Sequence, residues 1–298
     1  MTAGKAYDCI IIGAGPGGLQ AAIHLARYNR RVLLVDRGGG RTSHALEIEN
    51  YLGLERVGGK ELVETGIRQI QSFGAEFRRE QVASLEVEQG FTVVTDRARY
   101  QASYVVVSAG ATEKPPPIKG MNRFFGRTIF TCVDCDGYRT TGRNLVILGD
   151  SLETVRLALA MRQMFTPEIT LVLPPALRLP PDQAELLNED GIAFLTGIPA
   201  EFLGDPELTG VRLQDGRQAA CEVVMLNYDY VLNDAFLAGL GLERDSGGGK
   251  LATDHFCETS VKNLFALGAL KSGKAQAIIA AGQGAAVGIE INRRLLEL

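Results

Sequence analysis

Residues Tyr7 to Gly18 of the chain read YDCIIIGAGPGG and carry the clearest structural signal in the sequence. Tyr7–Ile12 is short, apolar and rich in isoleucine, which predicts a buried strand. The glycines that follow satisfy the pattern G-x-G-x-x-G, and Leu19–Tyr28 has the apolar spacing of a helix. The next apolar run, Arg31–Val35, predicts a second strand. The chain therefore begins with a β-α-β unit.

The glycine turn is typical of dinucleotide binding. Gly13 permits the tight turn, Gly15 lets the backbone approach a diphosphate, and Gly18 lets helix and strand pack closely. With Pro16 in the same turn, the diphosphate is expected at the helix N-terminus, where free N–H groups and the helix dipole favour anions. Asp36 ends the second strand, where a carboxylate binds an adenosine ribose hydroxyl and repels a 2′-phosphate. FAD or NAD therefore fits better than NADP; an ordinary glycine turn is the alternative.

Composition limits the classes of partner. The chain has 298 residues, 46% of them hydrophobic, which is enough for two domains. The net charge of −4 gives no basic excess, so neither nucleic acid nor an anionic membrane is expected as partner. No apolar run reaches the roughly 18–20 residues that a membrane span needs, and the amino terminus lacks a cleavable leader pattern. We expect a cytoplasmic protein.

A second β-α-β pattern begins in the middle of the chain, at the predicted strand Asn144–Leu148, helix Leu152–Gln163 and strand Ile169–Leu173. Other strands are predicted at Ser84–Val87, Phe91–Thr95, Tyr100–Val107, Gly210–Leu213, Glu222–Leu226 and Asn263–Leu267, and a long helix at Ala275–Leu296. We expect an α/β fold of two Rossmann-like, three-layer ββα domains, the second inserted in the first. The FAD-binding domain would comprise residues 1–117 and 245–298, and the second domain residues 118–244, with Pro115–Pro117 as a stiff connector.

The cysteines separate into two kinds. Cys9, Cys221 and Cys257 lie in apolar or mixed segments, where a small core or surface residue is the expected role. Cys132 and Cys135 form C-x-x-C and are followed by Asp136. A zinc site would need a second such pair, and the three histidines form none. A redox disulfide is the better interpretation, with Asp136 as general acid or base for a thiolate proton; two structural thiols are the alternative.

The chain resembles the low-molecular-weight thioredoxin reductase family over nearly its whole length. The residues that carry the resemblance are Gly13–Gly18, Glu49-Asn50-Tyr51 with Gly53, Val107–Ala111, Gly126-Arg127, Cys132–Gly137, Ala275-Gln276-Ala277 and Ala280-Ala281-Gly282. The resemblance implies that Cys135 contacts the flavin of FAD, Cys132 exchanges with the substrate disulfide, and Asp136 transfers the proton. It assigns Asn50, Ala109, Gly110, Gly268, Gln276 and Ala277 to the FAD site, and it implies a homodimer that acts on a dithiol or disulfide such as that of thioredoxin.

Departures from the family concern NADPH and one flavin contact. The second β-α-β unit should carry G-x-G-x-x-A, but this chain has Gly149-Asp150-Ser151-Leu152-Glu153-Thr154. Ser151 stands where the backbone must approach a diphosphate, and Asp150 and Glu153 add negative charge to an anion site. The arginine cluster that would hold a 2′-phosphate is reduced to Arg178. NADPH is therefore not expected, with weak and atypical nicotinamide binding as the rival. Ala269 replaces an aspartate that hydrogen-bonds the flavin nucleotide, so this end of the FAD site must be arranged differently.

These departures favour a pyridine-nucleotide-independent branch of the family, and its electron partner stays open. A second FAD stacked near the first ranks first, with Lys271, Ser272 and Lys274 as candidate phosphate ligands and solvated lysines as the alternative. A ferredoxin-linked thioredoxin reductase ranks second, because no aromatic tail follows the last helix. A small-molecule dithiol oxidase that uses oxygen ranks third. A flavin-binding regulatory protein without turnover is the non-enzymatic alternative.

Overall fold

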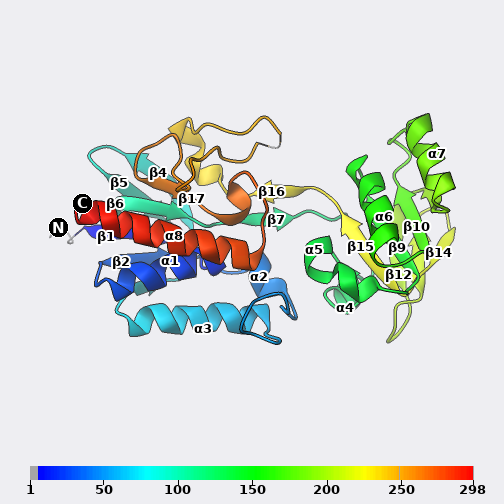
Figure 1. Cartoon of the computed structure of the whole chain (residues 1–298), viewed down its shortest axis with the longest axis horizontal. Coiled ribbons are helices and arrows are strands. Elements are labelled where there is room, and N and C mark those ends of the chain that lie inside the picture. The colour runs from blue at the N-terminus through cyan, green and yellow to red at the C-terminus, as the bar shows by residue number, and fades with distance from the viewer. Residues whose placement is uncertain (1–5, 248, 298) are drawn as a thin grey trace. The chain divides into compact units, whose positions relative to one another are not determined.

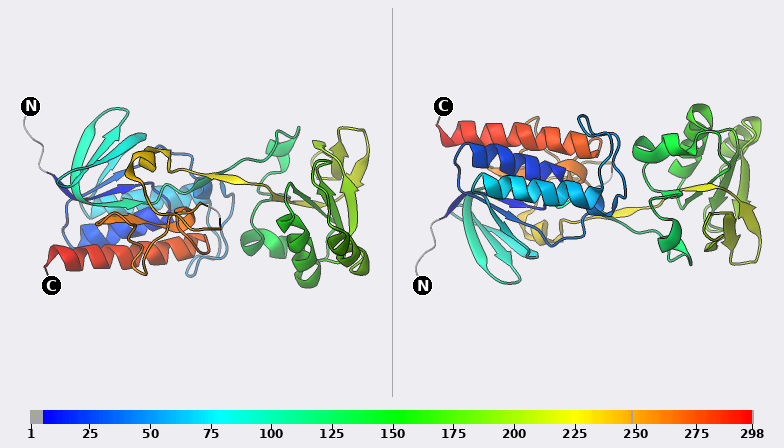
Figure 2. Two further views of the ribbon diagram at one scale, coloured as in Figure 1. Left: turned by 90° about the horizontal axis from the view of Figure 1, so that it is seen from above. Right: turned by 90° about the horizontal axis from the view of Figure 1, so that it is seen from below.

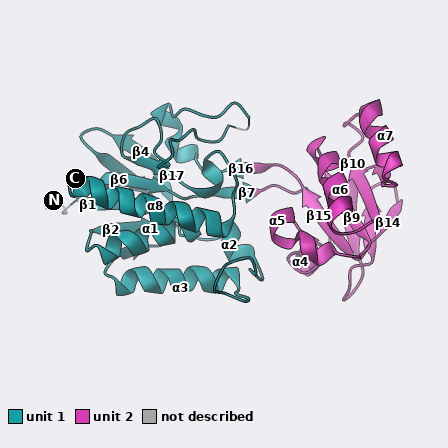
Figure 3. Ribbon diagram, viewed as in Figure 1, with its two compact units in different colours: residues 1–112, 231–298 teal, residues 113–230 magenta. Residues whose placement is uncertain are grey.

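A computed structural model describes residues 6–247 and 249–297. The chain divides into two compact units (Figure 3), one of residues 1–112 and 231–298 and the other of residues 113–230. The first unit therefore uses both ends of the chain, and the second is inserted in it. This confirms the predicted α/β architecture of two domains with one inserted in the other.

The first unit is built on a seven-stranded sheet in the order β3-β2-β1-β6-β5-β4, with β17 beside β6. Its strands are β1 (Tyr7–Ile12), β2 (Val32–Val35), β3 (Glu76–Arg78), β4 (Val82–Val87), β5 (Phe91–Thr95), β6 (Arg99–Val107) and β17 (Leu264–Ala266). The strands β1, β2, β3 and β17 run parallel within the sheet, whereas β4 and β5 form an antiparallel extension. The parallel strands β1 and β2 are buried on both faces for most of their length, as their unbroken apolar runs predict.

Helices cover one face of this sheet (Figures 1 and 2). They are α1 (Pro16–Arg27), α3 (Gly59–Ser72) and α8 (Ala277–Leu295), with the short α2 (Arg41–His44) beside the start of α3. Small residues let α1 and α8 approach each other closely, because a Cβ atom at Gly284 would stand 2.0 Å from the carbonyl oxygen of Gly17. On the other face, side chains of β1, β2 and β6 form a second core with residues of the antiparallel extension β4–β5 and of the 3-10 turn η2 (Ala235–Leu240). The unit thus has the predicted three layers.

The second unit is built on a five-stranded parallel sheet in the order β11-β10-β9-β15-β8. These strands are β8 (Ile129–Phe130), β9 (Leu145–Gly149), β10 (Ile169–Leu173), β11 (Ala193–Thr196) and β15 (Val223–Asn227). A separate antiparallel sheet contains β12 (Pro199–Leu203), β13 (Gly210–Leu213) and β14 (Gln218–Ala220). The helices and 3-10 turns are α4 (Met121–Phe124), α5 (Val133–Asp136), η1 (Gly137–Thr140), α6 (Glu153–Met164) and α7 (Pro181–Glu189). The β9-α6-β10 succession is the second predicted β-α-β unit.

Both crossings between the units lie in a two-stranded ribbon of β7 (Ala111–Glu113) and β16 (Tyr230–Leu232). The units meet after residues 112 and 230, so the predicted boundaries at 117 and 244 are too late by 5 and 14 residues. Pro115–Pro117 belongs to the inserted unit, and residues 231–244 belong to the first unit. The reason for the second error is packing, since Leu237 in this segment is buried in the core of the first unit.

Within the residues that the structure describes, no helix is both long and apolar enough to cross a membrane.

Substitution of Gly284 by alanine is expected to lower the free energy of unfolding by about 1–3 kcal/mol, because the new Cβ would overlap the Gly17 carbonyl and force α1 and α8 apart. The matched control is Gly282→Ala in the same helix, where a Cβ would meet no atom within 4 Å. That change should leave stability equal or higher, since alanine is the better helix former by about 1 kcal/mol. Urea unfolding followed by circular dichroism measures both; equal effects would contradict the close helix contact.

Candidate functional site

A pocket in the first unit lies where the carboxyl ends of the parallel strands meet the N-termini of α1 and α8. Its lining comprises Gly13, Ala14, Gly15, Pro16, Gly17, Asp36, Gly40, Arg41, Thr42, Ser43, Val63, Ser108, Ala109, Gly110, Ala111, Leu267, Gly268, Ala269, Ala275, Gln276, Ala277 and Ala280. Most residues predicted to bind the cofactor are therefore brought together, although five separate chain segments supply them. The carboxyl edge of a parallel sheet is the usual place for a ligand in this kind of fold.

The glycine turn between β1 and α1 can be formed only by glycine at two positions. Gly13 has φ +104°, and a Cβ there would stand 2.4 Å from the carbonyl oxygen of Ser108. A Cβ at Gly18 would stand 2.1 Å from the Gly13 carbonyl oxygen. Gly15 differs, because its Cβ would have no protein atom closer than 3.8 Å. The space beside Gly15 is thus open to a ligand, as the motif predicts.

Asp36 is fixed at the end of β2 by backbone donors. Its Oδ1 accepts a hydrogen bond from the Ala14 N–H at 3.0 Å, and its Oδ2 accepts one from the Gly38 N–H at 2.8 Å. The Arg79 guanidinium also pairs with this carboxylate. These contacts tie the carboxylate to the glycine turn and leave it in the pocket wall, the position expected for binding a ribose hydroxyl.

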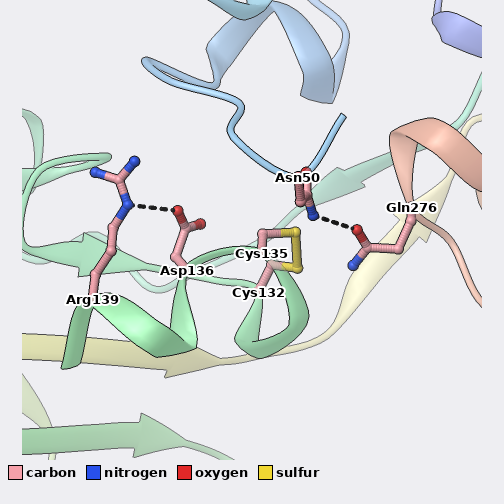
Figure 4. Close-up of a disulfide and its surroundings, with 6 residues drawn as sticks. All are labelled: Asn50, Cys132, Cys135, Asp136, Arg139 and Gln276. Carbon is pink, nitrogen blue, oxygen red and sulfur yellow. Dashed lines mark hydrogen bonds and ion pairs between the residues drawn. A yellow bond between two sulfur atoms is a disulfide. The ribbon is translucent and has the colours of Figure 1, made fainter. Parts of the chain in front are cut away.

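Two predicted cofactor residues, Gly18 and Asn50, are not in the pocket lining. Gly18 contributes through its close contact with the Gly13 carbonyl, which shapes the turn. The Asn50 side-chain amide donates a hydrogen bond of 2.8 Å to Oε1 of Gln276, which does line the pocket (Figure 4). Asn50 is therefore connected to the pocket through Gln276.

Several lining residues were not predicted. Arg41, Thr42 and Ser43 belong to α2, and the glycine run before it was the sequence signal that a ligand approaches the backbone there. Arg41 brings a positive charge to a pocket expected to hold a diphosphate. Ala269, which stands where the family has a flavin-binding aspartate, also lines the pocket, and the Gly268 N–H donates to Oε1 of Gln283 at 2.8 Å.

The second unit carries the redox motif. Cys132 and Cys135 form a disulfide with a Cα–Cα distance of 5.3 Å (Figure 4). Cys132 lies at the N-terminus of α5, and its carbonyl oxygen accepts the Asp136 N–H at 3.0 Å. Both cysteines are partly accessible. This is the pairing that the C-x-x-C motif predicts.

Asp136 has a partner that the sequence did not reveal. Its Oδ1 lies 3.4 Å from Nε of Arg139, on the 3-10 turn η1 that follows α5 directly. In Figure 4 the two side chains point toward each other on one side of the turn, and the sulfur atoms lie on the other. Because residues three apart on a helical turn are neighbours, the i, i+3 spacing could have indicated this contact.

The turn between β9 and α6 occupies the position of a second dinucleotide motif, and its surroundings are acidic. Burial and the negative charge of Asp229 both raise the pKa of the Asp150 carboxyl. Glu153 stands in the first turn of α6 and pairs with Arg156, with Nη1 3.0 Å from Oε1. A Cβ at Gly149 would stand 2.2 Å from Oγ1 of Thr154. The end of β9 is therefore closely packed, beside a cluster of carboxylates.

The other three cysteines are buried, with exposed fractions of 0% for Cys9, 3% for Cys221 and 6% for Cys257. Burial raises the pKa of each thiol, to about 12 for Cys221. Since the thiolate is the reactive form, these thiols have structural roles, as predicted. Among residues 6–247 and 249–297, no cluster of three or more His, Cys, Asp or Glu side chains could hold a metal ion.

A family model for the pyridine nucleotide-disulphide oxidoreductases matches residues 7–285. The chain belongs to this family of flavoprotein oxidoreductases. Within it the chain is thioredoxin reductase-like: it is 31% identical over 311 residues to the thioredoxin reductase of Mycolicibacterium smegmatis, and the match covers 99% of both chains.

Solved structures agree. The crystal structure of HlmI superposes with a TM-score of 0.91 at 32% identity, over 98% of this chain and 93% of that one. The thioredoxin reductase from Streptococcus pyogenes gives a TM-score of 0.89 at 26% identity, over 98% and 99%. The predicted family and fold are thereby confirmed at this level; the relatives named as thioredoxin reductases do not themselves indicate a branch that dispenses with NADPH.

Substitution of Gly15 by alanine is expected to weaken dinucleotide binding by about tenfold or more while the protein remains folded. Gly15 has φ −72°, which alanine adopts without strain, and the new methyl group would occupy only the open space beside the turn. FAD titration of the apoprotein, followed by flavin fluorescence, measures the affinity. Gly282→Ala on α8, outside the pocket, is the control. Unchanged affinity in Gly15→Ala would mean that the ligand does not approach this turn.

Proposed function

We propose that the protein is an FAD-dependent disulfide oxidoreductase that exchanges electrons between its flavin and the Cys132–Cys135 disulfide without NADPH. The observation that carries the proposal is the contrast between the two β-α-β turns. The turn at Gly13–Gly18 opens into a pocket at Gly15, with an arginine in the lining, whereas the turn at Gly149–Thr154 has Ser151 in the place of that open glycine and carries Asp150 and Glu153.

The residues of the first pocket fit FAD. The open space at Gly15 and the N-terminus of α1 suit the diphosphate, with Arg41 adding a positive charge, and Asp36 suits the adenosine ribose. Gln276 and Ala277, at the start of α8, and Ala109 and Gly110, after β6, are the proposed contacts of the rest of the cofactor. Bound FAD would supply two-electron redox chemistry.

The cysteine pair performs thiol–disulfide exchange in this proposal. With a dithiol substrate, one substrate thiolate attacks Sγ of Cys132, the Cys132–Cys135 bond breaks, and Cys135 leaves as a thiolate. The second substrate thiolate attacks the mixed disulfide, the substrate sulfurs join, and Cys132 leaves. The substrate loses two electrons and the enzyme disulfide gains them. The two protons of the substrate end on the enzyme thiols, with Asp136 as carrier; the reverse sequence reduces a substrate disulfide.

The acidic second turn supports independence from NADPH. A nicotinamide dinucleotide would place its diphosphate against Ser151, near Asp150 and Glu153, and like charges at such a site oppose binding. The segment after β10 carries one arginine, Arg178, between its paired prolines, where a 2′-phosphate would need several cations. The family relatives named thioredoxin reductases make thioredoxin, or a small protein like it, the first dithiol partner to test.

The electron partner at the flavin remains one of three: a second FAD, ferredoxin or oxygen. Two of the loop residues proposed to hold the phosphates of a second FAD already have hydrogen-bond partners within the protein. Lys271 donates to the Ser272 carbonyl oxygen at 3.3 Å, and the Ser272 hydroxyl donates to Oδ2 of Asp245 at 2.6 Å. Counting flavin against protein after denaturation discriminates: two per chain would support the second FAD, and one would leave ferredoxin and oxygen.

Substitution of Cys135 by serine should change the number of electrons that the protein takes up in a reductive titration. We expect the wild-type protein to take up one more electron pair than the flavin alone accepts, because the disulfide is reduced as well. Cys135→Ser should lose this extra pair. Anaerobic titration with dithiothreitol, followed by the flavin spectrum, measures the difference, with Cys221→Ser as control because that thiol is buried and unpaired with another cysteine. Identical titrations would favour the regulatory, non-enzymatic alternative.

NADPH and NADH at micromolar concentration are expected to leave the flavin oxidised, because the second turn repels a diphosphate. Dithiothreitol under the same anaerobic conditions should bleach it. Stopped-flow absorbance records both reactions. Rapid, saturable bleaching by NADPH would overturn the independence from NADPH and place the protein with NADPH-using thioredoxin reductases.

A further inference from the structure

Arg139 lies beside the redox motif, and nothing in the exchange chemistry described so far uses it. We propose that Arg139 is a positioning residue: it holds the Asp136 carboxylate and offsets its negative charge, so that a thiolate can form at the adjacent Cys135. This inference rests on the proposed function and adds a residue to the same site.

The contact between the two side chains is partly buried. Nε of Arg139 lies 3.4 Å from Oδ1 of Asp136, and the side chains are 20% and 25% exposed. Water and salt screen such a pair less than they screen an ion pair on the open surface. The carboxylate is consequently held toward Arg139, as Figure 4 shows.

The arginine is itself held in place by aromatic rings. Its guanidinium carbon lies 5.8 Å from the centroid of the Phe130 ring and 5.5 Å from that of Tyr138. Phe130 is buried at the end of β8, only 3% exposed. Cation–π contacts of this kind favour a fixed guanidinium. Arg139 is therefore anchored to the sheet that precedes the disulfide as well as to the turn that follows it.

The redox turn carries negative charge that a nearby cation can offset. Asp134 and Asp136 both lie in α5, within the same turn as the two cysteines. When Cys135 leaves as a thiolate, a further negative charge forms next to Asp136, and like charges at that distance disfavour it. A cation near a thiol favours the thiolate, and a cation bound to the neighbouring carboxylate reduces the repulsion. Arg139 is placed to do the second, because its guanidinium lies against the Asp136 carboxylate.

The test is a double-mutant cycle on the flavin-loaded protein, with dithiothreitol as the reductant. The rate of disulfide opening is measured by quenching with an alkylating agent and counting alkylated Cys132 and Cys135 by mass spectrometry. We expect Arg139→Gln to slow opening by about tenfold, part of the 10²–10⁴-fold that a placed acid–base group contributes. Arg139→Lys, which keeps the charge, should recover part of the rate. In an Asp136→Asn background, Arg139→Gln should have little further effect, because its action passes through the carboxylate.

The matched control is Arg143→Gln, just beyond the same turn, whose guanidinium donates to the Glu222 backbone carbonyl at 2.9 Å. Its rate should equal that of the wild type. The inference is overturned if Arg139→Gln opens at the wild-type rate, if Arg139→Lys is as slow as Arg139→Gln, or if Arg139→Gln slows the Asp136→Asn protein equally. Should Arg139→Gln not fold, Arg139→Lys is compared with the wild type in the presence and in the absence of Asp136→Asn. A rate of disulfide opening that Arg139→Lys lowers equally in both backgrounds would then overturn the inference. Alkylation counts thiols without reference to the flavin, so failure of the flavin coupling is observed separately in the titration.

Discussion

Close contacts between backbone segments around the first glycine turn determine how the elements of the first unit pack together. The Gly13 carbonyl lies against Gly18, the Ser108 carbonyl lies against Gly13, and the Gly17 carbonyl lies against Gly284. These contacts join β1, α1, the end of β6 and α8, which come from both ends of the chain. They also keep the N-terminus of α1 directed at the open space beside Gly15. The packing of the unit and the shape of its pocket therefore have the same cause.

Much of this arrangement could be predicted from the sequence, because the glycine spacing and the apolar runs are local signals. The strands Phe91–Thr95 and Ile169–Leu173 have the predicted bounds, and α1 begins earlier than predicted because Pro16 is compatible with the first helical turn. The helix α3 (Gly59–Ser72) was missed although its buried face is regular, with Gly59, Val63, Gly66 and Ile70. Two of its core positions are glycines, which an apolar pattern does not register.

The features of the site likewise divide into those that local sequence motifs predict and those that depend on tertiary contacts. The disulfide and most of the glycine pocket follow from motifs whose residues are near one another in sequence. The contribution of Arg41 to the pocket wall, the bond between Asn50 and Gln276, and the anchoring of Arg139 on the Phe130 ring depend on side-chain directions in the folded chain. The domain boundary at 230 likewise depends on where Leu237 is buried. Such tertiary choices leave no periodic signal in the sequence.

The ribbon of β7 and β16 determines where the inserted unit could be removed from the chain or exchanged. Its strands enter and leave the inserted unit side by side, and within that unit the Lys114 N–H donates to the Asp229 carbonyl oxygen at 3.1 Å. The ends of the excised segment 113–230 would therefore be adjacent, and the host that remained could be closed between Thr112 and Val231 by a short hairpin loop. Adjacent ends are the geometry that tolerates domain insertion and circular permutation. Both connections of the disulfide-bearing unit to the first unit therefore lie in one ribbon, so a single site of chain cutting and rejoining would suffice to exchange that unit.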